Sequence, residues 1–164
     1  MRRMKNLLKV ATGTVVALGV MSASAFANNT GNIEFSGEVT DSCTLVVSDA
    51  TGVLNISDNY KTLTSVGGTE SSGNVKMTTN VATAKLSVKK PDAWDTQPVE
   101  YTEATKFTAA FQFNDDANKT LHTAAQEIGL IGSRSAKIHL TATAQNDALF
   151  VAGDYAATVV VTCD

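Results

Sequence analysis

The sequence predicts an all-β protein, and three observations lead to this fold class. Apolar and polar residues alternate with period two in short segments, Thr, Val and aromatic residues populate those segments, and turn-forming clusters separate them. The clearest segment lies at 107–114, and its apolar residues share one face: Phe107, Ala109, Phe111 and Phe113. Several short strands with frequent turns are typical of a β-sandwich.

The first 27 residues have the layout of a signal peptide of the general secretory pathway. Residues 1–9 carry four basic residues and no acidic one, an apolar run follows over roughly 10–21, and Ala-Phe-Ala at 25–27 fits a cleavage site. A membrane anchor is the alternative, but the run is shorter than the ~20 residues that a spanning helix needs. We therefore expect cleavage after Ala27 and export to the bacterial periplasm or beyond.

The chain that remains after cleavage is acidic and of a size that suits one domain. It has 137 residues, with 9 Lys and Arg against 16 Asp and Glu, a formal charge of −7. At this size about two thirds of the unfolded surface becomes buried, so a real core is possible. The charge argues against nucleic acid and against anionic membrane as partners. No segment after the leader is long and apolar enough to span a bilayer.

The alternating pattern predicts eight strands after the leader. In chain order they are Ile33–Thr40, Cys43–Val47, Val53–Ser57, Asn74–Thr79, Thr83–Lys89, Phe107–Asn114, Ala136–Thr143 and Tyr155–Cys163. The same alternation predicts which side chains of two of these strands face the core, namely Leu86, Val88, Ile138 and Leu140. His139 would then point to solvent.

The composition of the segments between these strands predicts turns and one long connection. Residues 66–74 and 114–120 are rich in Gly, Asn, Asp and Ser and are expected to form polar turns. Residues 91–106 hold both prolines and the tryptophan, and we expect a long surface connection that places Trp94 and Tyr101 against the sheets. One short helix is expected at 123–131.

Two cysteines, Cys43 and Cys163, predict one disulfide, because an even count in an exported protein indicates pairing. Paired, they would close nearly the whole domain into one loop, which contributes ~4–5 kcal/mol in the chain-entropy account. Metal binding is the alternative. Only His122 and His139 are available besides the acids, and neither has a metal-like spacing, so no metal and no cofactor is expected.

No motif predicts an enzyme. The sequence has no G-x-S-x-G elbow and no H-E-x-x-H, and Ser87 and Lys90 match S-x-x-K only within an alternating strand, whereas that motif works at the start of a helix. The predicted disulfide leaves no thiol nucleophile. Asp115, Asp116 and the acids of 92–103 are candidates for a calcium ion, but solvated loop carboxylates are the more common case. We expect no catalytic residue.

The two ends of the exported chain resemble a known family. Residues 31–43 read GNIEFSGEVTDSC and residues 152–163 read AGDYAATVVVTC. Both are similar to the corresponding ends of chaperone–usher pilus subunits, in particular the major pilins. The resemblance implies an incomplete immunoglobulin-like β-sandwich that lacks its seventh strand and is completed by donor-strand exchange with the next subunit, a form of β-augmentation.

Carried over residue by residue, the resemblance divides the chain into a donor segment at 28–41 and a pilin domain at 42–164. The donor side chains would be Ile33, Phe35 and Val39, with Gly37 at a position where the family often keeps a small residue. The groove that accepts a donor would lie along the last strand, at Tyr155, Ala157, Val159 and Val161.

The same resemblance implies partners and a place in the cell. The partners would be identical or related pilin subunits, a periplasmic chaperone and an outer-membrane usher. The product would be a fimbria on the surface of a Gram-negative cell that supports adhesion, with this chain as a shaft subunit. The alternative is a self-contained exported β-sandwich that acts as a binding module, in which Ile33–Thr40 is its own first strand.

The cysteines depart from the pattern of the type 1-like subunits, whose disulfide usually joins the first strand to the second. Here a bridge between Cys43 and Cys163 would join the two strands that flank the groove. Strands on either side of a vacant lane lie ~10 Å apart, whereas a disulfide needs Cα atoms within ~7 Å. Either the two edges converge at the bridge, or the bridge passes beyond the donor's last paired residue. Archaic or colonisation-factor-like branches of the family stay open.

Overall fold

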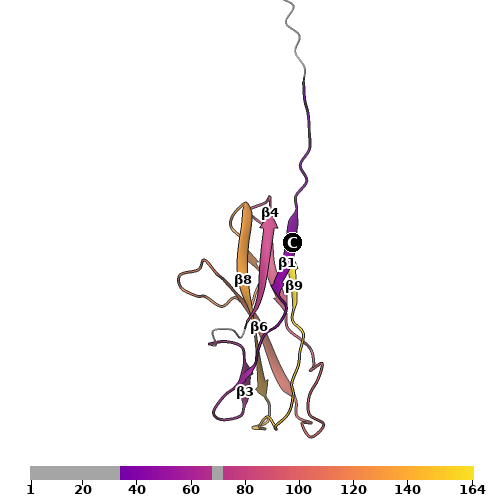
Figure 1. Cartoon of the computed structure of the whole chain (residues 1–164), viewed down its shortest axis with the longest axis vertical. Helices are drawn as coiled ribbons and strands as arrows, with labels where there is room; N and C mark the ends of the chain where they lie inside the picture. Colours follow the sequence, from indigo (N-terminus) through magenta and orange to yellow (C-terminus); the bar gives the residue numbers. More distant parts are fainter. Residues whose placement is uncertain (1–33, 68–71) are drawn as a thin grey trace, which may run out of the picture. The chain divides into compact units, whose positions relative to one another are not determined.

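The computed structural model of the chain describes residues 34–67 and 72–164 (Figure 1). The chain divides into two compact units, Met1–Gly37 and Glu38–Asp164. In the first unit the described residues, 34–37, are exposed and have no regular secondary structure. The predicted signal peptide and Ile33 lie outside the described residues.

The second unit is built from β-strands, and its described residues contain no helix. No helix capable of crossing a membrane is therefore found in the described part of the chain. The strands are β1 (Cys43–Asp49), β2 (Asn55–Ile56), β3 (Thr62–Thr64), β4 (Gly73–Thr79), β5 (Lys85–Lys89), β6 (Thr105–Phe113), β7 (Gln126–Glu127), β8 (Gly132–Ala144) and β9 (Val160–Cys163). They form two sheets in which every ladder is antiparallel, so the all-β prediction is confirmed.

The larger sheet is organised around β8. One edge of β8 pairs with β6 along nine residues, from Thr105 opposite Ala144 to Phe113 opposite Ala136. Its other edge pairs first with β4 and then with β3, and the order across the sheet is β1-β4-β8-β3-β2. Strand β1 is therefore an outermost strand of this sheet.

The smaller sheet has the order β7-β5-β9, which makes β9 an edge strand as well. Its central strand packs Leu86, which is fully buried, against side chains of the larger sheet. The main members of this first core cluster are Val75, Met77, Leu86, Phe111, Phe113, Ile128, Ala136 and Ile138. Two antiparallel sheets with a shared core are consistent with a β-sandwich.

A second core cluster lies around the end of β8 and the start of β6. Its buried members are Leu63, Tyr101, Phe107, Leu140, Ala142, Ala144 and Phe150. The indole nitrogen of Trp94 donates a hydrogen bond to Oγ1 of Thr105 (3.0 Å), and its ring packs edge-on against Phe107 with centroids 4.8 Å apart. Tyr101 is 2% exposed. The prediction that the connection at 91–106 places Trp94 and Tyr101 against the sheets is confirmed.

Three predictions of secondary structure differ from the structure. Of the strand predicted at Tyr155–Cys163, only Val160–Cys163 forms β9. The described part of the predicted strand at 33–40 forms no strand, and residues 34–42 are all exposed. The helix expected at 123–131 is wrong, because this segment pairs with β5 through the short strand β7. The amide of Ile128 donates to the carbonyl of Ala84 (2.7 Å), and Gly129 has a φ of +75°. A helix of nine residues is only marginally stable in water, so this segment pairs with the edge of β5 instead.

Candidate functional site

The described residues enclose a groove of about 520 Å³ between the edges of the two sheets. One wall is β1 with the loop that follows it, and the other wall is the segment 155–161 that leads into β9. The side chains of the floor come from the strands β4 and β8. The residues that line it are Leu45, Val47, Asp49–Gly52, Leu54, Ser65, Gly73–Val75, Ile138–Leu140, Tyr155–Val159 and Val161.

The wall at 155–161 alternates strictly between half-buried and exposed residues. Tyr155, Ala157, Val159 and Val161 are half-buried, and the residues between them are exposed. This is the period of a strand with one face toward a core. Strand β9 pairs with β5 through residues 160–163, and no described strand pairs with its other edge.

The opposite wall is the free edge of β1. This strand pairs with β4 from Cys43 opposite Thr79 to Asp49 opposite Asn74, and no described strand pairs with its other side. Leu45 packs partly against the first core cluster, while Val47 keeps 54% of its surface exposed. The groove is therefore bounded by two rows of backbone groups without strand partners, and such edges can accept an added strand.

The apolar side chains of the floor belong to both core clusters, and Ser65, Asn74 and His139 add polar groups beside them. Val75 and Ile138 are members of the first cluster, and Leu140 is a member of the second. Val159 packs against both clusters, which places it where the two meet. An apolar side chain inserted between the walls would therefore contact the core of the domain directly.

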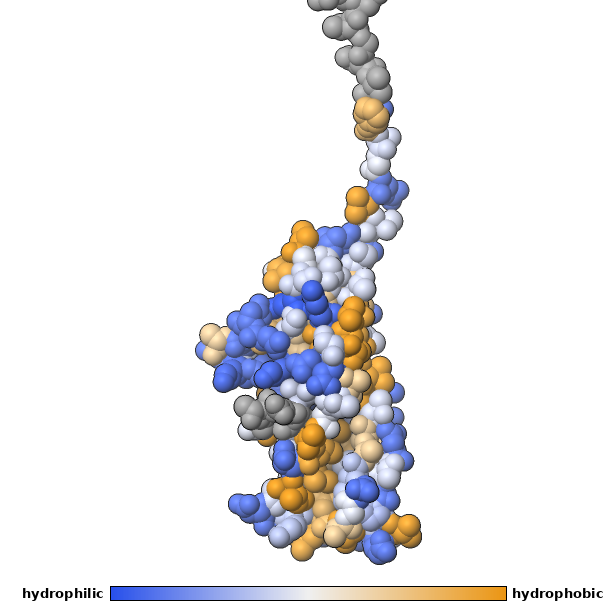
Figure 2. All heavy atoms as spheres, in the orientation of Figure 1, coloured by the Kyte–Doolittle hydropathy of each residue, from blue (hydrophilic) through white to orange (hydrophobic). Residues whose placement is uncertain are grey.

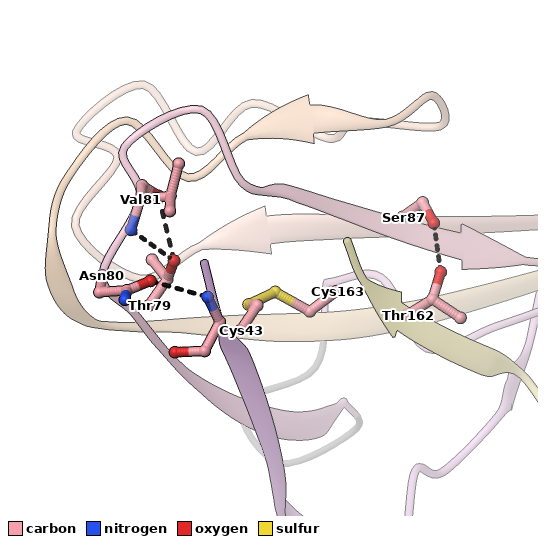
Figure 3. Close-up of a disulfide and its surroundings, with 8 residues drawn as sticks. Cys43, Thr79, Asn80, Val81, Ser87, Thr162 and Cys163 are labelled. Atoms are coloured by element: carbon pink, nitrogen blue, oxygen red, sulfur yellow. Dashed lines mark hydrogen bonds between the residues drawn. A yellow bond between two sulfur atoms is a disulfide. The ribbon is translucent and has the colours of Figure 1, made fainter. Parts of the chain in front are cut away.

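A disulfide between Cys43 and Cys163 joins the two walls at one end of the groove (Figure 3). The Cα atoms of the two cysteines are 5.9 Å apart. The predicted disulfide is confirmed, and the two edges converge at this point, as its geometry requires.

At the other end, a carboxylate shapes the loop that follows β1. Oδ1 of Asp49 accepts hydrogen bonds from the amide of Thr51 (2.9 Å) and from its hydroxyl (2.7 Å). These two hydrogen bonds lower the pKa of Asp49 below its ordinary value, because they favour the charged form. The carboxylate of Asp49 thus fixes the turn that leads from β1 to Leu54.

The structure brings together one set of the predicted site residues and not the other. Tyr155, Ala157, Val159 and Val161 all line the groove. Phe35 and Val39 are not among the lining residues, and 90% and 84% of their surfaces are exposed. Apolar residues also reach the surface of the domain on the face that Figure 2 shows. No atom comes within 4 Å of a Cβ built on Gly37. Ile33 lies outside the described residues.

The prediction that His139 points to solvent is wrong. Its side chain is 7% exposed, and its Nδ1 lies 3.3 Å from the carbonyl oxygen of Ser65. Because a carbonyl can only accept, Nδ1 carries the proton in the neutral ring, and Nε2 is left as a buried atom without a partner among the described residues. Burial lowers the pKa of His139 below its ordinary value, and the Ser65 carbonyl opposes this in part.

We expect the fold to lose stability as the pH falls below about 6.5, the pKa of histidine in an unfolded chain. Below that value the unfolded chain binds a proton that the folded protein excludes from His139, so the folded state is disfavoured. One such group changes the free energy of unfolding by up to about 1.4 kcal/mol per pH unit. Urea denaturation between pH 7.5 and pH 5 measures the slope, and the variant His139→Gln is the control that should flatten it. An equal slope in both proteins would exclude His139 as its origin.

The polar side chains considered for chemistry have structural contacts in the described residues. Ser87 exchanges a hydrogen bond between hydroxyl groups with Thr162, across the β5–β9 ladder. Asp115 forms an ion pair with Arg134 (2.9 Å), and Asp116 accepts hydrogen bonds from the amides of the turn that follows it. The described residues hold no group of three or more His, Cys, Asp or Glu side chains arranged for a metal ion.

Sequence reasoning missed the floor of the groove. It placed the first strand beside the groove only through the family resemblance and named none of that strand's lining residues. Leu45 and Val47 alternate visibly in the sequence, but only the strand order shows that their strand is an unpaired edge. Comparison with known proteins adds nothing to this picture, since no protein-family model and no curated protein matches the chain.

Proposed function

We propose that the chain is the structural subunit of a chaperone–usher surface fibre, and that it polymerises by donating residues 28–41 to the groove of a neighbouring subunit. The observation that carries the proposal is the groove between two unpaired edges, β1 and the segment 155–163, with apolar side chains from the core in its floor. In this proposal the two sheets are an immunoglobulin-like sandwich without its seventh strand, and the groove is the vacant place of that strand.

The donor segment has the pattern that such a groove needs. Ile33, Phe35 and Val39 alternate with polar residues, so one face of an added strand would be apolar. Burial of these three side chains at ~1.5–3 kcal/mol each gives on the order of 5–8 kcal/mol. Each backbone hydrogen bond to the free edges adds ~1 kcal/mol net. Residues 34–42 form no strand of their own domain, which leaves them available for a neighbour.

The proposed function also requires two partners, a periplasmic chaperone and an outer-membrane usher. A subunit with an unfilled apolar groove and two free edges is prone to aggregation, so a periplasmic chaperone would cover the groove and an outer-membrane usher would exchange that cover for the next donor. Assembly of many copies at the cell surface gives a fimbria for adhesion. No catalytic step is part of this function.

Deletion of residues 28–40 tests the proposal. We expect the wild-type exported chain to form polymers that resist dissociation in detergent, and the truncated chain to form none. A synthetic peptide of residues 28–41 should bind the truncated chain and stabilise it, by about 2.7 kcal/mol at a peptide concentration one hundred times Kd. The same peptide with Phe35→Asp is the control and should give no such stabilisation.

The self-contained binding module makes the opposite prediction. If 33–40 is a strand of its own domain, the wild-type chain should purify as a compact closed monomer, and the deletion should unfold that monomer without any effect on polymers. This outcome would contradict the proposal.

A further inference from the structure

The disulfide does more to the groove than join its walls, because it leaves no room for a strand between them. A strand placed between two others needs ~4.7–4.9 Å on each side, so its neighbours must be about 9.5 Å apart. The Cα atoms of Cys43 and Cys163 are only 5.9 Å apart. The groove is therefore closed to an added strand at this level.

The other end of the groove has no such closure. There the walls are Tyr155 and the loop 49–54, and most residues of that loop are exposed. No ladder and no disulfide joins Tyr155 to this loop in the described part of the chain. An added strand therefore fits between the walls only on this side of the bridge.

The chain that precedes β1 leaves the domain at the closed end. Asn80, at the end of β4, holds it there through three hydrogen bonds. Its side-chain amide donates to the carbonyl of Thr40 (2.8 Å), its Oδ1 accepts from the amide of Ser42 (2.8 Å), and its own amide donates to the Ser42 carbonyl (3.3 Å). Residues 40–42 therefore continue the line of β1 past the end of β4.

We propose that the Cys43–Cys163 disulfide is the end stop of the groove. It confines the N-terminal segment of a second copy to the part of the groove between the bridge and the open end. The paired part of that segment then ends with Ile33 beside Val161, and residues 28–32 of the donor pass outside the groove. This inference rests on the proposed function and adds the direction and depth of insertion. The donor is attached to its own domain outside the open end, so its N-terminus points toward the bridge and it runs antiparallel to 155–163.

The spacing of the side chains fits this register at four successive positions. With Ile33 beside Val161, the other pairs are Phe35 with Val159, Gly37 with Ala157, and Val39 with Tyr155. The largest donor side chain, Phe35, then lies at Val159, where the two core clusters meet. The smallest donor residue, Gly37, lies beside the smallest wall residue, Ala157.

The bridge excludes a deeper register, and Asn80 keeps the chain's own segment out of the groove. A slip by two residues, the smallest that keeps the apolar face inward, would put Ile33 level with Cys163, where the walls are too close. To fill its own groove, a chain would have to reverse within 40–42, which Asn80 holds in line with β1. Each groove is thus left for another copy.

Photo-crosslinking in assembled fibres of the full exported chain tests the register. Benzoylphenylalanine is placed at position 33 in one preparation and at position 39 in another, and mass spectrometry locates the crosslinks. We expect position 33 to react with Val161 or Leu45 of another copy, and position 39 to react with Tyr155. In fibres of the double variant Cys43→Ala and Cys163→Ala, crosslinks from position 33 should shift by two residues or more, toward position 163.

Four results would overturn the inference. Crosslinks from position 33 at Tyr155 would reverse the direction of the donor. Crosslinks from position 33 at Val159 would mean that the donor stops short of the bridge, and an unchanged crosslink site in the cysteine-free fibres would mean that the bridge does not set the depth. If the cysteine-free chain fails to assemble, the crosslink partners of positions 33 and 39 in the disulfide-bonded fibres test the direction and depth of the donor by themselves. The absence of any crosslink between copies would overturn the proposed function as well, so the two failures are distinguishable.

Discussion

Replacement of Cys43 and Cys163 by alanine is expected to lower the free energy of unfolding by about 4–5 kcal/mol. The bridge spans a sequence separation of 120 residues, and in the chain-entropy account a loop of this length restricts the unfolded chain by about that amount. Typical domains are stable by only 5–15 kcal/mol, so this loss would bring the fold close to unfolding at room temperature. Urea denaturation of the two proteins at equal concentration measures the difference.

The single variant Cys43→Ala, with its free thiol capped, is the matched control. It lacks the bridge as the double variant does, so the two should have the same stability within a few tenths of a kcal/mol. A loss below about 1 kcal/mol in the double variant would show that the unfolded chain gains little freedom when the loop is opened, contrary to the entropic account.

Replacement of Phe35 by Asp is expected to abolish polymerisation and to leave the subunit as stable as before. Phe35 is 90% exposed in the chain itself, so its loss removes no contact of the subunit. In the proposed fibre the same position becomes buried. The variant would lose the ~1.5–3 kcal/mol that burial of the Phe35 ring contributes. Burial of the new carboxylate would cost several kcal/mol more. Together these terms weaken assembly by a factor of at least about a thousand.

Val99→Asp is the matched control, because Val99 is also 90% exposed but lies outside the donor segment and the groove. It should polymerise as the wild type does, and Phe35→Leu should keep most of the assembly. Gel electrophoresis without heating measures the polymers, and circular dichroism measures the thermal stability of the subunits. Normal polymers from Phe35→Asp would contradict the assignment of Phe35 to a buried donor position.

The strands with strict alternation could be predicted from the sequence. Phe107, Phe111 and Phe113 are buried as the pattern of 107–114 predicts, and Leu86 and Ile138 face the core. The short strands β3 and β7 could not be predicted, because two or three residues carry no period of their own. Their conformation comes from pairing with β8 and β5, which are distant in the sequence.

His139 shows a second limit of local patterns. Alternation places it on the face opposite Ile138 and Leu140, but its burial depends on Ser65, which is more than seventy residues away in the chain. The groove shows the same limit. Its wall at 155–161 follows from alternation, whereas its floor needs the order of β4 and β8 in the sheet. Which distant strands pair with one another cannot be predicted from the pattern of ten neighbouring residues.

The disulfide also determines how the domain carries tension. Force that enters through the residues before Cys43 reaches the C-terminal end across two side chains, because Cys43 is bonded to Cys163 and Asp164 follows directly. The intervening loop, with a sequence separation of 120 residues, would extend to roughly 400 Å if it were pulled out. Because the covalent bridge connects the two ends of this loop, a pulling force passes through the bridge and does not extend the loop. A domain tethered at these two points therefore cannot lengthen by unravelling, however far its strands separate.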